Sequence, residues 1–154
     1  MLIPEVKRKQ RKAQYKKPEV IKLLENLADA DARTKHPTMR PEHIAPRKYR
    51  DENENDLIRC VVQYKRFKGG FASRISNQGT FNKKLNKFIP GTSRKGLADV
   101  MATYRGKSLH IEVKIGHDKQ SEAQMKIEKE VTASKGIYFI AHNFTEFKDW
   151  FDTL

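Results

Sequence analysis

Residues 95–115 read KGLADVMATYRGKSLHIEVKI, and this stretch decides the fold. Two short apolar runs, residues 97–104 and 109–115, lie on either side of the turn-forming sequence Arg105-Gly106-Lys107. Runs of this length around a glycine turn are typical of a β-hairpin. Because side chains alternate along a strand, the apolar residues of the second run are expected to face the core and its polar residues to face the other way.

The hairpin carries ionisable side chains in unusual places. Its second strand is expected to bury Leu109, Ile111, Val113 and Ile115 and to present His110, Glu112 and Lys114 on the opposite face. Glu112 and Lys114 are then two residues, roughly 7 Å, apart along the strand. Asp99 begins the first strand among core-like residues, where an aspartate is disfavoured. The three side chains are therefore predicted to form a site.

Two carboxylates and a lysine suit phosphodiester hydrolysis. The reaction needs an activated water and a positive centre for the transition state, and a bound Mg²⁺ supplies both. Mg²⁺ and Mn²⁺ prefer oxygen ligands, here Asp99, Glu112 and the backbone carbonyl of Val113. Lys114 is suited to hold the water or the phosphate. The pattern predicts a metal-dependent nuclease.

Each of these residues also has an ordinary structural explanation. Glu112 and Lys114 would form a surface ion pair on a solvated strand face, contributing ~0–1 kcal/mol. Asp99 would merely begin a strand after a turn.

Composition and charge limit the function classes. The 154 residues suffice for one modest domain, and 32 Lys or Arg against 19 Asp or Glu give a net charge of +13. Such an excess predicts a polyanionic partner, nucleic acid first of all. The single Cys60 excludes an intramolecular disulfide and a cysteine-clustered zinc site. No apolar run approaches the ~20 residues that span a bilayer, so we expect a soluble cytoplasmic protein, in host cytoplasm if viral.

The basic excess is concentrated in the first fifty residues, which carry 14 Lys or Arg against 6 Asp or Glu. This part is predicted to be an arm and linker, with a short helix near residues 18–24 and three prolines in residues 35–50. Its cluster is predicted to bind nucleic-acid backbone with strongly salt-dependent affinity, the alternative being a tail that only aids solubility. The cluster consists of Lys7, Arg8, Lys9, Arg11 and Lys12.

Residues 51–154 are predicted to be the catalytic domain. A helix around residues 57–64 and a strand at residues 71–75 precede a polar, exposed loop at residues 76–95. After the hairpin come a helix at residues 121–134, a strand at residues 137–141 and a helix at residues 145–151. The order is α-β-β-β-α-β-α. The helix after the hairpin is a crossover, so the last strand is expected to pair in parallel within a mixed sheet.

With these residues stated, the chain resembles the PD-(D/E)XK nuclease superfamily and, within it, the VRR-NUC family of virus-type and repair nucleases. The resemblance covers residues 51–154. It rests on an acid at the first helix, Gly96-x-x-Asp99, Glu112-x-Lys114 and a glutamine opening the following helix, Gln124. The chain departs from the family pattern at Ala98, where a proline is common, and at Ile115, which displaces a common glycine to position 116.

The resemblance implies a restriction-endonuclease-like core, an α/β fold with a mixed β-sheet flanked by helices. It implies that Glu54 adds a metal-facing carboxylate and that Gln124 orients Lys114, the water or the DNA. Glu52 and Asp56 lie equally near that helix start. Glu54 is also explained by the helix macrodipole, and Gln124 by a capping box, so both alternatives stay open.

The implied partner is DNA, cut by a homodimer at branched structures such as a Holliday junction or a flap during repair or recombination. The basic residues placed to contact it are Lys83, Lys84, Arg94 and Lys95, with Arg74, His110 and His117 as lesser candidates. A non-catalytic basic nucleic-acid-binding protein would explain the charge equally well. An RNA-directed nuclease would use the same residues, because local geometry reads the 2′-hydroxyl.

Overall fold

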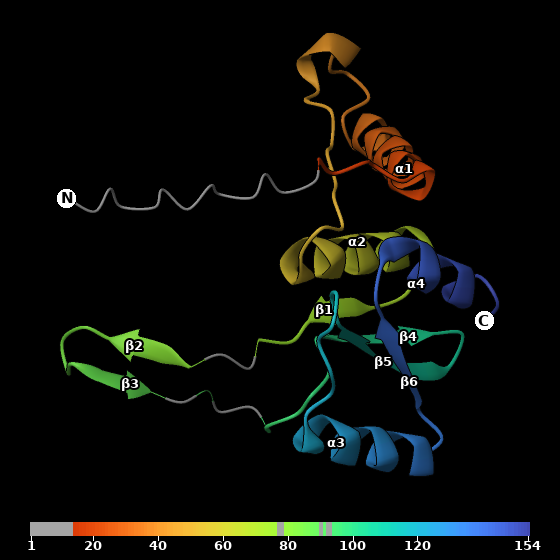
Figure 1. Cartoon of the computed structure of the whole chain (residues 1–154). Coiled ribbons are helices and arrows are strands. Elements are labelled where there is room, and N and C mark those ends of the chain that lie inside the picture. The colour runs from red at the N-terminus through yellow and green to blue at the C-terminus, as the bar shows by residue number, and fades with distance from the viewer. Residues whose placement is uncertain (1–13, 77–78, 90, 92–93) are drawn as a thin grey trace, which may run out of the picture.

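The structure, a computed structural model, describes residues 14–76, 79–89, 91 and 94–154 and places a four-stranded sheet between helices (Figure 1). Helices α1, α2 and α4 lie on one side of the sheet and α3 lies on the other. The elements are α1 (Glu19–Lys35), a 3-10 turn (Pro41–His43), α2 (Glu54–Phe67), β1 (Ala72–Arg74), β2 (Thr80–Asn82), β3 (Lys87–Ile89), β4 (Val100–Tyr104), β5 (Lys107–Val113), α3 (Glu122–Ala133), β6 (Ile137–Ala141) and α4 (Phe144–Phe151).

The main sheet is mixed, in the order β1-β4-β5-β6. The β1–β4 and β4–β5 pairs are antiparallel, whereas β5 and β6 are parallel and joined through α3. Arg105 and Gly106 both have positive φ, 47° and 77°, as the tight β4–β5 turn requires. The predicted hairpin, the crossover and the mixed sheet flanked by helices are confirmed.

The hydrophobic core lies between the sheet and the three helices on its one side. Leu109, Ile111 and Val113 of β5 are buried there, as their alternation predicted. Three phenylalanines of α4 surround the Tyr64 ring of α2 with edge-to-face contacts, at centroid distances of 5.6–6.4 Å. This packing fixes β5 from the side of α2 and α4, and thereby fixes the strand that carries Glu112.

The N-terminal helix is longer than predicted and belongs to the core. α1 has 17 residues, and its side chains at Ile21, Leu24 and Ala28 are buried in the same cluster as those of the sheet. Tyr49, in the expected linker, is also buried, and its backbone N–H donates to Glu25 Oε1 over 2.9 Å. The apolar residues continue at helical spacing past residue 24, which the short-helix prediction overlooked.

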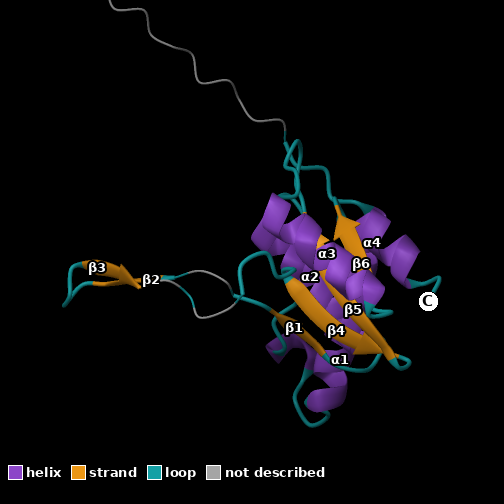
Figure 2. Ribbon diagram, turned by 90° about the horizontal axis from the view of Figure 1, so that it is seen from below, coloured by secondary structure: helices purple, strands orange, loops and turns teal. Residues whose placement is uncertain are grey.

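The sequence predicts a loop over residues 76–95. The structure instead shows a second, two-stranded sheet within this range. β2 and β3 pair antiparallel with Phe81 opposite Phe88, and Figure 2 shows them standing apart from the main body. Asn82 Oδ1 accepts hydrogen bonds from the N–H groups of Lys84 and Leu85 over 3.0 and 3.2 Å. This side-chain turn, with Asn86 at φ 46°, closes a hairpin that the polar composition concealed.

Helix α3 approaches the chain just before Asp99 very closely. Gly96 has φ 88°, and a Cβ atom there would lie 2.5 Å from the Ala123 backbone. Only glycine permits both this backbone conformation and this contact. Gly96 therefore brings the start of α3 over the polar face of β5.

Among the described residues, no helix is both long and apolar enough to cross a bilayer.

Candidate active site

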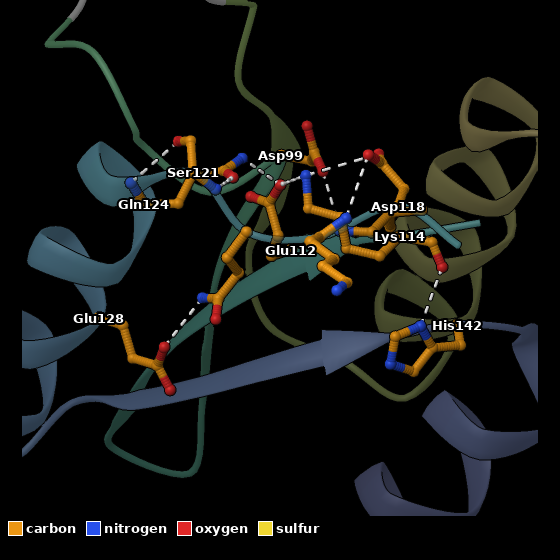
Figure 3. A network of polar contacts seen from close by, with 11 residues as sticks. Asp99, Glu112, Lys114, Asp118, Ser121, Gln124, Glu128 and His142 are labelled. Carbon is orange, nitrogen blue, oxygen red and sulfur yellow. Dashed lines mark hydrogen bonds and ion pairs between the residues drawn. The ribbon is translucent and has the colours of Figure 1, made fainter. Parts of the chain in front are cut away.

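Asp99, Glu112 and Lys114 come together where β4 begins and β5 ends (Figure 3). The Lys114 ammonium lies 3.0 Å from Glu112 Oε1. Asp99 Oδ2 accepts a hydrogen bond of 2.8 Å from the backbone N–H of Val113, the residue between the other two. The antiparallel pairing of β4 with β5 thus places the three side chains side by side.

Glu112 is buried, which alternation along the strand did not predict. Its residue is 1% exposed, because α3 covers the face on which it lies. Among the described residues, its Oε2 atom is buried without a hydrogen-bond partner. Burial, together with the charge of Asp99, raises the pKa of Glu112 to about 7. A buried carboxylate with one unsatisfied oxygen beside a second carboxylate is suited to hold a cation.

The ammonium and the backbone of Lys114 both have polar partners. Its ammonium lies between Glu112 and Asp118, whose Oδ2 is 3.7 Å away. Burial acts to lower the pKa of Lys114, but the hydrogen bond and charge of Glu112 outweigh it and raise this pKa above its ordinary value. Its backbone N–H donates to Ala141 of β6 over 3.0 Å, and its carbonyl oxygen lies 3.1 Å from His142 Nδ1. Lys114 is therefore a protonated, positioned cation.

Gln124 is the capping-box residue of α3 and also contacts Glu112 of the candidate site. Its side-chain oxygen accepts from the Ser121 N–H over 2.8 Å, and its own N–H donates to Ser121 Oγ over 3.3 Å, which completes a capping box. Its side-chain amide also donates to Glu112 Oε1. The cap of α3 and the candidate site thus share one residue.

The structure separates the three acids near the start of α2. Asp56 accepts from the side chain of the capping residue Asn53, and Glu52 pairs with Arg50. Glu54 is exposed and has neither contact, and its charge acts on the pKa of Glu112. Even so, no three His, Cys, Asp or Glu residues in the described part of the chain lie close enough together to hold a metal. Glu54 lies near the two carboxylates rather than among them.

The predicted nucleic-acid contacts are in different situations. Arg94 forms a bidentate ion pair with Glu130 of α3, at 2.6 and 2.7 Å, and so is already paired. Arg74 donates a hydrogen bond to Asn55 Oδ1 over 2.6 Å, and its positive charge acts to lower the pKa of Asp99. Lys83 and Lys84 are exposed at the β2–β3 turn, and Lys95 is exposed beside Gly96. The arm residues Lys7, Arg8, Lys9, Arg11 and Lys12 lie outside the described residues.

Sequence reasoning missed part of the polar face under α3. Asp118 reaches Lys114 from the loop after β5, and its position four residues on from Lys114 was the only signal. Gln120 donates to Glu128 over 2.8 Å on the same side of the sheet. Of the two histidine candidates, His117 is exposed, and burial lowers the pKa of His110. His110 is therefore a neutral group within the covered face.

Comparisons of the chain with protein-family models, with curated proteins and with solved structures gave no significant match. The geometry of the candidate site combines two adjacent carboxylates, a protonated lysine and an amide held by a helix cap. Such a set can bind a divalent cation together with a phosphate group.

Proposed function

We propose that this protein is a metal-dependent nuclease that hydrolyses phosphodiester bonds in DNA. The observation that carries the proposal is the Glu112 carboxylate, buried with Oε2 unsatisfied, beside Asp99 and 3.0 Å from the Lys114 ammonium. An ordinary core would exclude this arrangement, because burying a charge without full pairing is unfavourable. The same proposal includes membership of the VRR-NUC family and a restriction-endonuclease-like core, which the sequence resemblance implies.

The residues present fit Mg²⁺ or Mn²⁺. Asp99, Glu112 and the Val113 carbonyl supply hard oxygen donors, and the unsatisfied Oε2 of Glu112 needs a positive partner. Two carboxylates are enough for Mg²⁺, which keeps several water or phosphate ligands, so Glu54 acts as an outlying charge. A bound ion would polarise the phosphoryl oxygen and lower the pKa of a water molecule.

The chain's own residues then have distinct tasks. The Lys114 ammonium, fixed between Glu112 and Asp118, holds a phosphate oxygen or the attacking water as a point charge. Gln124 keeps Glu112 Oε1 engaged, so that Oε2 is left for the cation. The Val113 N–H fixes Asp99 in the orientation that puts its carboxylate beside Glu112.

Charge supports DNA as the substrate, because a net +13 attracts a polyanion and exposed Lys95 lies four residues before Asp99. The resemblance extends the proposal to branched DNA cut by a homodimer, since paired cuts need two sites related by a two-fold axis. RNA is the alternative substrate, because the same residues would act on it. Cleavage assays with matched DNA and RNA distinguish the two substrates.

The test is cleavage of labelled linear duplex, single-stranded, flap and four-way-junction DNA, and of matched RNA, with Mg²⁺, Mn²⁺ or EDTA. We expect cutting that requires metal and that falls roughly 100-fold or more in Lys114→Ala. The matched control is Lys119→Ala, which removes an exposed lysine from the neighbouring loop and should cut normally. If the wild type binds these nucleic acids but cuts none with any metal, the protein is a non-catalytic binding protein instead.

A further inference from the structure

The β2–β3 hairpin presents two phenylalanine rings on one face. Phe81 and Phe88 are directly opposite one another across the two strands. Their residues are 53% and 62% exposed. Because side chains alternate, Lys87 and Ile89 lie on the other face of β3. The hairpin therefore has a largely exposed aromatic face, against which the described residues place only the backbone of Gly79, next to the Phe88 ring.

This exposed face needs a partner. An isolated two-stranded hairpin is marginally stable in water, and an open aromatic pair adds an unfavourable exposed surface. The hairpin nevertheless has its own closing turn, because Asn82 bonds to two backbone N–H groups and Asn86 adopts positive φ. A preformed hairpin with an unpartnered aromatic face is suited to bind flat, apolar groups.

Charge selects the partner. Residues 75–98 contain five Lys or Arg and no Asp or Glu. Lys83 and Lys84 are exposed in the turn, and Lys87 is exposed on β3. Two copies of this hairpin packed together would place one basic segment without acidic residues against another, which is unfavourable. A nucleic acid offers phosphates for the lysines and flat bases for the rings.

The hairpin is attached at the candidate site. The Ile75 N–H, at the end of β1, donates to the Asp99 carbonyl over 2.8 Å. The chain leaves the main sheet after β1 and re-enters it at β4, with β2 and β3 in between (Figure 2), so this excursion begins and ends next to the backbone of Asp99. A strand bound near Asp99 would pass the base of the hairpin.

We propose that the β2–β3 hairpin binds unpaired nucleobases by stacking them on Phe81 and Phe88, while Lys83 and Lys84 of the turn contact the adjacent phosphates. The inference rests on the proposed nuclease function, whose substrate class it narrows to nucleic acid with unstacked bases. Bases within a duplex are already stacked and are not free to stack on the rings. Stacking on aromatic side chains is tolerant of sequence, so the hairpin selects structure rather than sequence.

The experiment measures binding of the full chain in EDTA, where no cleavage occurs. The probe is a single-stranded DNA of about 15 nucleotides with 2-aminopurine in its centre, compared with a strand that has abasic sites at the central positions. A fully paired duplex is the third ligand. Anisotropy gives affinity, and quenching of 2-aminopurine fluorescence reports stacking.

We expect the wild type to quench the fluorescence and to prefer the base-bearing strand over the abasic strand by about tenfold or more. The double variant Phe81→Ala/Phe88→Ala should lose both the quenching and the preference. The matched control is Phe71→Ala, which removes a ring that is 61% exposed immediately before β1. It should behave as wild type, and thermal unfolding should confirm that both variants stay folded.

A second variant isolates the phosphate contacts. Lys83→Gln/Lys84→Gln should weaken binding to base-bearing and abasic strands equally and reduce the salt dependence. The proposal is overturned if the phenylalanine double variant keeps the preference for bases. It is also overturned if that variant converts a dimer to a monomer with unchanged DNA affinity, because a second copy then covers the rings.

The two proposals fail separately. Metal-dependent cutting by a protein whose hairpin does not stack bases would overturn only this inference. Base stacking by a protein that cuts nothing would overturn only the nuclease.

Discussion

The candidate site depends on Glu112, because this ionisable side chain is buried. It belongs to a strand whose other face is the hydrophobic core, and yet it is itself 1% exposed. Lys114 and Gln124 both contact its Oε1 atom, and Oε2 is left. With a pKa of about 7, this group is about half protonated near neutral pH in the metal-free protein, and under the proposed function a bound cation would favour its ionised form.

The pKa of Glu112 predicts how stability depends on pH. In the folded protein this pKa is about 7, above the usual value near 4.3 in an unfolded chain. The folded state therefore binds a proton that the unfolded state releases. The stability contribution is complete below about pH 4 and is lost as pH rises through about 7.

We accordingly expect the metal-free protein to unfold at lower temperature as pH increases from about 5 to 8. Glu112→Gln should remove roughly 1–3 kcal/mol of this dependence and should raise the stability at pH 8. Thermal unfolding in EDTA across this pH range measures it, with exposed Glu42→Gln as the control. A pH dependence in Glu112→Gln that equals the wild type would show that another group titrates.

At the level of elements, the start of α3 is both a helix cap and a support for the site. Gln124 contacts Ser121 in the capping box and Glu112 in the site. Ser121 contacts only the cap. The pair of residues therefore separates helix stability from site geometry.

We expect Ser121→Ala and Gln124→Ala each to lower the free energy of unfolding by about 1 kcal/mol, the usual value of a cap. Only Gln124→Ala should also lower metal affinity and the cleavage rate, because it leaves Glu112 Oε1 without its amide partner. Denaturant unfolding, metal titration and cleavage assays on both variants provide the comparison. Equal cleavage by the two variants would limit Gln124 to the cap.

Gly96 sets the distance between α3 and the strand that carries Asp99. Gly96→Ala would place a methyl group 2.5 Å from the Ala123 backbone at a positive φ. We expect a loss of about 2 kcal/mol or more in unfolding free energy, because α3 must move away and uncover Glu112. Gly106→Ala is the control, since it has positive φ in a turn with no atom near the added methyl. It should lose less stability, by calorimetry, and keep full metal affinity.

For the whole molecule, the folded unit includes the N-terminal helix α1. A boundary at residue 51 was predicted, but the structure packs α1 into the core with Leu24 completely buried. The neighbouring Leu23 is 43% exposed on the same helix. The two leucines test whether α1 is part of the cooperative unit.

Leu24→Ala should lower the free energy of unfolding by about 2–5 kcal/mol, as expected for a leucine truncated in a core. Leu23→Ala should lower it by less than about 1 kcal/mol. Urea unfolding followed by Trp150 fluorescence, from α4 on the same side of the sheet, reports on the whole domain. Similar effects from both substitutions would mean that α1 is not packed as described.

The sequence alone determined the local elements and the order of the site residues. Alternation over residues 107–113, the Arg105-Gly106 turn and the Ser121 capping box are local signals, because strand period, turn dihedrals and helix caps involve residues close in the chain. They sufficed for the hairpin, the crossover helix and the parallel last strand. They also indicated Asp99, Glu112 and Lys114.

Only the tertiary structure decided what surrounds those residues. That α3 buries Glu112, that Asp118 reaches Lys114, and that Arg94 is paired with Glu130 depend on contacts between segments that no local pattern encodes. The same is true of α1, because its apolar side becomes part of the core only by packing against α2 and the sheet. Burial and electrostatic environment are sums over the whole fold, so the pKa of a carboxyl group cannot be read from its neighbours in sequence.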